Sequence, residues 1–191
     1  MKQITYIMAL IFTVSSQAQT EEKQKLPYYE IPEYSETYTA GTVAARMIDG
    51  LGFRFYWATE DLSDKDLEYK PNDDVRSAED TIDHVLDLSY IIVNSTLHKP
   101  NGSVEKSQMT YEHKRSQALI NLKTAADILR ESEDISQYKI IFGEREFPFW
   151  NQINGPIADA IWHCGQIASF RRTSGNPINS KISHFTGTVK D

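Results

Sequence analysis

Apolar residues recur at three- and four-residue steps in four stretches of the chain, which is the spacing of a helix with one buried face. These stretches lie near residues 36–61, 77–97, 110–132 and 155–173. No stretch shows convincingly the alternation of apolar and polar residues that is typical of a half-buried strand. The pattern therefore predicts an all-α fold, a four-helix bundle in which the apolar faces of the helices meet.

The last predicted helix has recognisable ends and an apolar stripe. Asn154 can cap its start, and Pro156 suits its first turn, where a missing N–H costs little. Gly175 lies where the helical pattern stops, as expected of a residue after a helix end. Asp159 and His163 are four residues apart and lie on the flank of the stripe. The stripe consists of Ile157, Ala160, Ile161, Cys164, Ile167 and Ala168.

Asp159 and His163 offer a carboxylate and an imidazole on one side of a helix, which is one way to hold a divalent transition metal. The same spacing also suits an ion pair or a hydrogen-bonded pair at the edge of a core. Two ligands do not complete a metal site. The candidate for a third is His84, in a predicted helix with a capping signal at Ser77 and a broad apolar face.

A histidine early in the second helix, followed by a last helix with a ligand-competent pair ahead of Gly165-Gln166, resembles the DinB/YfiT-like family of four-helix-bundle metalloproteins. The resemblance spans about residues 36–178. It implies that His84, Asp159 and His163 are the metal ligands, with Asp159 where the family more commonly has histidine. Two histidines and one carboxylate suit zinc, nickel, iron or manganese. The resemblance also implies a metal near one end of the bundle and a possible homodimer.

The N-terminus predicts export. Lys2, a short apolar run from Ile4 to Val14 and a small-residue exit around Ala18 are typical of a cleaved signal peptide over residues 1–18. The run is too short for a membrane-spanning helix, so we expect no span in the mature chain. Residues 19–35 are expected to be an extended, proline- and tyrosine-rich segment ahead of the bundle (36–178), and residues 179–191 a tail.

Charge and cysteine content narrow the possible partners and chemistry. Without residues 1–18 the chain has 19 basic and 27 acidic residues, a net charge of −8, which argues against nucleic acid and anionic membranes as partners. Cys164 is the single cysteine, so no intramolecular disulfide can form. It lies on the apolar stripe, which favours a core thiol over the alternative of a nucleophile.

Several other residues have predicted positions or roles. The aromatic segment 138–151 and Trp162 could either wall an apolar substrate pocket or complete the core, while Asp83 and Glu79 could support the ligands. Arg171 is expected to stabilise the end of its own helix. Surface positions are expected for His98, His113 and His184, and close helix contacts, within the chain or in a dimer, for Gly41, Gly50 and Gly52.

Two classes of function remain open from the sequence. The first is a metal-dependent enzyme with an unknown small-molecule substrate, performing either thiol-dependent transfer, as in some members of the resembled family, or metal-assisted hydrolysis. The second is a non-catalytic module that binds a small ligand or a partner and has a weak or lost metal site.

Overall fold

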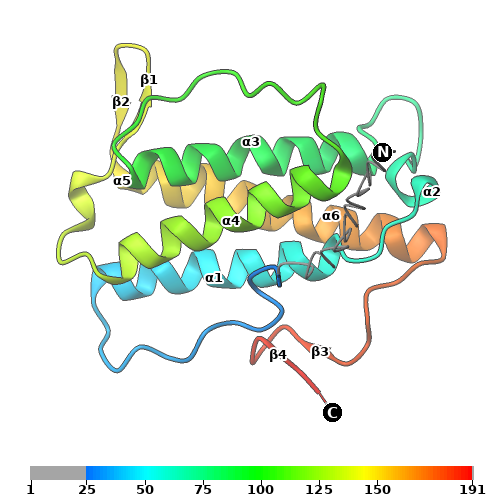
Figure 1. Ribbon diagram of the computed structural model, residues 1–191, viewed down its shortest axis with the longest axis horizontal. Helices are drawn as coiled ribbons and strands as arrows, with labels where there is room; N and C mark the ends of the chain where they lie inside the picture. The colour runs from blue at the N-terminus through cyan, green and yellow to red at the C-terminus, as the bar shows by residue number, and fades with distance from the viewer. Residues whose placement is uncertain (1–24, 191) are drawn as a thin grey trace, which may run out of the picture.

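The computed structural model describes residues 25–190, which are mostly helical, in agreement with the predicted all-α class. Four long helices lie side by side (Figure 1), and both α1 and α3 pack against α4 and α6. α3 and α4 run in the same direction and are joined by a long loop that passes back along α3, whereas α1 and α6 run the opposite way. The long helices are α1 (Ala40–Ala58), α3 (Ala78–Thr96), α4 (Tyr111–Arg130) and α6 (Ala158–Ser174).

Side-chain caps fix where most of these helices begin. Ser77 and Asp80 form a reciprocal capping box at the start of α3, as the sequence predicts. Thr39 and Thr110 accept backbone hydrogen bonds at the starts of α1 and α4. α6 ends at Gly175, whose φ of 96° is left-handed and therefore suits a residue without a side chain.

The predicted start of the last helix is wrong. Helical structure begins at Phe149 in α5 (Phe149–Gln152), continues through a wider π-type turn at Ile153–Ile157 and then becomes α6. Asn154 is therefore inside the helical segment and caps nothing. Gly155 leaves helical geometry with a ψ of −105°, and Pro156 has no N–H to donate, so the segment is kinked where a new helix was expected.

Short strands were also missed in the sequence. β1 (Ile140–Phe142) and β2 (Arg145–Phe147) form an antiparallel hairpin that turns at Gly143, with a φ of 59°. A second hairpin joins β3 (Ile182–Ser183) to β4 (Thr188–Val189) near the C-terminus. Strands of two or three residues are too short to produce a readable alternation of apolar and polar residues. For the first hairpin, the glycine after the apolar triplet Ile140-Ile141-Phe142 was the available signal.

The core is formed by the apolar faces of the four long helices. Cys164 is part of it, and burial raises the pKa of its thiol to about 12, so the thiol is protonated near neutral pH. This agrees with the prediction that Cys164 is a core thiol and argues against Cys164 as a nucleophile. The largest fully buried side chains are Phe53, Phe55, Ile48, Leu51, Ile82, Leu86, Ile92, Leu119, Leu122, Leu129, Ile157 and Ile167.

Arg171 stabilises a different helix from the one predicted. Its side chain is buried, and Nη1 donates to the carbonyl oxygens of Trp57 at 2.9 Å and Ala58 at 3.4 Å, which are the last residues of α1. Its Nε and Nη2 donate to the backbone and side-chain oxygens of Asn176. Arg171 therefore satisfies carbonyls that the end of α1 would otherwise leave unpaired.

The N-terminal segment (residues 25–39) runs along α1. The Tyr28 ring is buried against Gly52, where an added Cβ would lie 2.4 Å from the ring. A Cβ added at Gly41 would likewise lie 2.3 Å and 2.4 Å from the backbone carbonyl oxygens of Leu129 and Ser132. Two of the three glycines in α1 are thus covered by this chain, so they give no support to a dimer contact, and the homodimer stays a prediction.

Two expectations concern membranes and export. Within residues 25–190, no helix has the length and apolar composition needed to cross a bilayer. The signal peptide predicted for residues 1–18 lies outside the described residues, as do the first residues of the extended segment, and export stays a prediction.

Asp66 is a buried carboxylate that joins α2 (Asp64–Leu67) to the chain after α6. It is 4% exposed and accepts hydrogen bonds from Ser63, Ser174 and Asn176. Burial alone would raise the pKa of this carboxyl, but the hydrogen bonds from Ser174, Ser63 and Asn176 outweigh it and hold the pKa well below its ordinary value. The ionised form of Asp66 therefore stabilises the folded protein.

Replacing Asp66 by alanine is expected to lower the free energy of unfolding by about 3 kcal/mol near neutral pH, because several charge-assisted hydrogen bonds are lost. A lowered carboxyl pKa gives stability that is present above the pKa of the unfolded chain and disappears as the pH falls towards the folded pKa. The difference from wild type should therefore shrink below about pH 4. Urea unfolding of both proteins at several pH values measures this difference in the free energy of unfolding. Asp64→Ala, at an exposed position of the same helix, is the control and should change little.

Candidate metal centre

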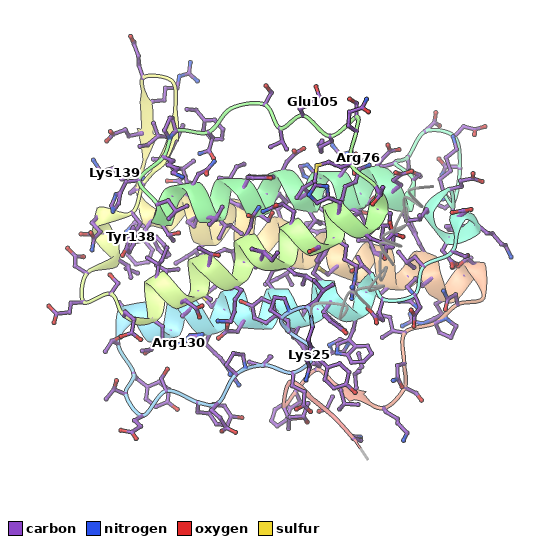
Figure 2. The ribbon with its side chains drawn as sticks, viewed as in Figure 1. Lys25, Arg76, Glu105, Arg130, Tyr138 and Lys139 are labelled. Atoms are coloured by element: carbon purple, nitrogen blue, oxygen red, sulfur yellow. The ribbon has the colours of Figure 1, made fainter. Side chains whose placement is uncertain are left out.

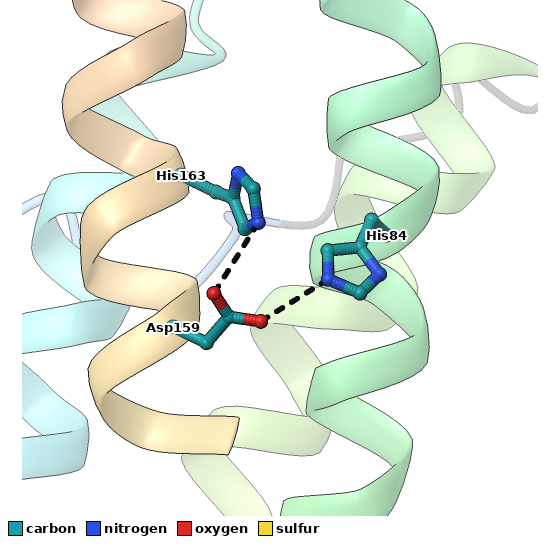
Figure 3. A group of neighbouring side chains, drawn as sticks. All are labelled: His84, Asp159 and His163. Atoms are coloured by element: carbon teal, nitrogen blue, oxygen red, sulfur yellow. Dashed lines mark hydrogen bonds and ion pairs between the residues drawn. The ribbon is translucent and has the colours of Figure 1, made fainter. Parts of the chain in front are cut away.

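The three side chains predicted as ligands come together between two helices. His84 lies in the second turn of α3, and Asp159 and His163 lie one turn apart in α6. Figure 3 shows the imidazole of His84 facing α6, with the carboxylate of Asp159 between the two rings. Because His84 is 75 residues from Asp159 in sequence, this meeting depends on the packing of α3 against α6.

The distances within the cluster suit a common ion. Asp159 Oδ2 lies 3.2 Å from His84 Nε2, and Asp159 Oδ1 lies 3.4 Å from His163 Nε2. One possible ligand atom from each residue can be chosen so that all three lie within 4.8 Å of one another. Ligands at about 2.1 Å from a tetrahedral ion are about 3.4 Å apart. To hold a divalent metal, the widest separation between ligand atoms would have to shorten by up to about 1.4 Å.

Gln166 orients one of the imidazoles. Its Oε1 lies 2.9 Å from His163 Nδ1, so an Nδ1–H can donate to this amide oxygen. Such a bond leaves the lone pair of His163 on Nε2, the nitrogen that faces Asp159. The sequence analysis used Gln166 only as part of the Gly165-Gln166 motif and did not predict its contact with His163. The contact could have been predicted, because residues three apart on a helix are neighbours.

The cluster lies at the edge of the core and is open on one side. The side chains of His84 and His163 are 29% and 16% exposed, and that of Asp159 is 42% exposed. An ion held by these three groups would therefore keep positions accessible to water or a substrate, as catalytic zinc sites do and closed structural sites do not.

The same contacts also agree with the simpler interpretation of Asp159. Its carboxylate is within ion-pair distance of His163 four residues later, which is the helix pair considered from spacing alone. The structure adds His84 from a second helix to that pair. Three metal-competent groups from two helices are a more specific arrangement than a pair within one, but the geometry alone fits both interpretations.

Other residues named in the sequence lie apart from the cluster. Asp83 and Glu79 both form ion pairs with Lys114 of α4, at 2.9 and 3.1 Å. They therefore link α3 to α4 and do not support the metal ligands. Trp150 lines a cavity of about 180 Å³ with Ala40 and Ile135, away from the cluster. Trp162 is 78% exposed on the surface of α6. The surface positions predicted for His98, His113 and His184 are confirmed.

Comparisons with protein-family profiles, with curated proteins and with solved structures found no match to this chain. The resemblance to the DinB/YfiT-like family therefore rests on the few residues quoted from the sequence.

Proposed function

We propose that this protein is a DinB/YfiT-like four-helix bundle that binds one divalent transition metal through His84, Asp159 and His163. The observation that carries the proposal is the convergence of two imidazoles and a carboxylate, from α3 and α6, within ion-binding distance of one another. The Gln166 contact, which leaves His163 Nε2 free to bind, supports it. Zinc, nickel, iron and manganese all suit such a ligand set.

The open side of the cluster favours an enzyme over a structural metal site. A bound ion would supply Lewis acidity towards a small-molecule substrate, in a thiol-dependent transfer or in hydrolysis by a bound water. The residues of this chain would hold the ion, orient His163 through Gln166 and leave the outward face accessible. Export of the enzyme is part of the proposal and rests on the signal peptide predicted for residues 1–18.

A non-catalytic binding module is the second candidate. One observation favours it: Asp159 already lies at ion-pair distance from both histidines, so the cluster can be held together by these contacts without an ion. In that case the protein would bind a ligand or partner elsewhere on its surface.

Metal analysis separates the two candidates. Wild-type protein loaded with zinc, nickel, iron or manganese and then freed of unbound ions is expected to retain about one equivalent, measured by elemental analysis. The variants His84→Ala and His163→Ala should each lose it, because two remaining ligands hold an ion weakly. His113→Ala removes an exposed histidine on α4 and should leave the metal content unchanged. If the wild-type protein retained no metal under any loading condition, the metal-enzyme proposal would be wrong and the non-catalytic binding module would be favoured.

A further inference from the structure

A second cavity lies on the other side of the molecule from α3, between the N-terminal segment and α1. Its volume is about 310 Å³, and none of the three candidate metal ligands lines it. Figure 2 shows Arg130, which contributes to its wall, on the side of α1 and α4 along which the N-terminal segment runs. The residues that matter for its chemistry are Tyr34, Tyr38, Val43, Arg46, Met47 and Arg130.

Arg46 is a half-buried cation in this cavity without a carboxylate partner. Within residues 25–190, no acidic oxygen lies within 4.0 Å of its guanidinium nitrogens. Its Nη1 donates to the carbonyl oxygen of Pro32 at 2.7 Å, and its guanidinium carbon lies 4.6 Å from the centre of the Tyr34 ring. A guanidinium has five N–H donors, so most of its hydrogen-bonding capacity is left for another acceptor.

The two carboxylates that line the cavity do not form an ion pair with Arg46. Asp49, which is 1% exposed, pairs with Arg130 at 3.1 Å and also accepts a hydrogen bond from Tyr28. This buried pair is neutral as a whole. Glu33 lies on the exposed part of the N-terminal segment, where water and salt screen its charge. Glu33 also lines the cavity, so the formal charges of its lining sum to zero, but Arg46 lies beyond ion-pair distance of every carboxylate in the described residues.

Apolar groups surround that charge. Tyr34 and Tyr38 are 74% and 95% exposed, and Val43 beside them on α1 is also exposed. Large apolar side chains that gather around a cavity at a protein surface are typical of a ligand-binding site, particularly where a few polar groups converge on it. A volume of about 310 Å³ is at the lower end of the range for small-molecule pockets.

We propose that this cavity is a binding site for a small organic carboxylate with a flat apolar body. The carboxylate pairs with the guanidinium of Arg46, because charge-assisted hydrogen bonds between arginine and a carboxylate are among the strongest in proteins. The apolar body packs against Tyr34, Val43 and Met47, and Tyr38 covers it from the solvent side. The site is independent of the metal proposed at His84, and its occupancy does not depend on that proposal.

The test is isothermal titration of the metal-stripped protein with 2-naphthoate and with its neutral counterpart 2-naphthylmethanol. Stripping the metal prevents the carboxylate from binding an ion at His84. Saturable binding of the naphthoate is expected, with the neutral compound at least tenfold weaker, because only the anion can pair with Arg46. His84→Ala should bind the naphthoate as wild type does.

Variants locate the site. Arg46→Met should weaken naphthoate binding at least tenfold, whereas Arg54→Met, a half-buried arginine on the same helix that lies outside the cavity, should not change it. Tyr38→Ser alters a side chain that is almost fully exposed and cannot disturb the core, and it should also weaken binding. Absence of saturable binding up to millimolar naphthoate, equal binding of the neutral compound, or unchanged binding in Arg46→Met with a wild-type melting temperature would each overturn the proposal.

Discussion

Replacing Asp159 by alanine is expected to lower the affinity of the protein for a divalent metal by about 100-fold or more. Asp159 contacts both histidines of the cluster and supplies its only negative charge, and losing even an outer-shell partner of a metal ligand costs about 10–100-fold. Competition with a chelator of known affinity measures the change for each metal. The protein should remain folded, because the Asp159 side chain is 42% exposed.

Asp159→His is the matched variant for this experiment. It restores the residue more common in the resembled family, so it should keep metal binding and shift the preference towards zinc or nickel through a more nitrogen-rich ligand set. If Asp159 only pairs with its neighbours, the alanine variant would lose about 0.2–0.5 kcal/mol of stability. Unchanged metal affinity in Asp159→Ala would remove this residue from the site and leave two histidines.

Replacing Arg171 by methionine is expected to lower the free energy of unfolding by about 3–5 kcal/mol. The methionine side chain can fill part of the space but cannot donate, so the carbonyl oxygens of Trp57 and Ala58 at the end of α1 lose a buried partner. Each buried acceptor left unpaired costs about 1–3 kcal/mol, and the hydrogen bonds to Asn176 are lost as well. Chemical denaturation followed by circular dichroism measures the loss.

Arg172→Met is the control for Arg171→Met. Arg172 is the next residue of α6 and is exposed, so its replacement should change the stability by less than about 0.5 kcal/mol. If the two arginines merely stabilised the end of α6 through its dipole, both variants would lose similar, small amounts of stability. Equal effects of the two substitutions would contradict the role assigned to Arg171.

The sequence by itself determined the helices and many of their ends. A helix is a local structure, so the three- and four-residue recurrence of apolar side chains and the caps at Ser77 and Gly175 are readable in short windows. It also placed Asp159 and His163 on one side of the same helix, because their spacing is one turn. The kink at Gly155-Pro156 was misread as a helix start, since proline favours both the first turn and a kink.

Only the tertiary structure decided what each of these faces meets. The sequence pattern identified His84 as a candidate ligand. Its closeness to Asp159, which is 75 residues away in the sequence, follows from the packing of α3 against α6. The carbonyls that Arg171 satisfies belong to α1, and the cavity around Arg46 exists only because the N-terminal segment lies along that helix. Contacts of this kind depend on how whole helices pack, and no local spacing along the chain encodes which surfaces will meet.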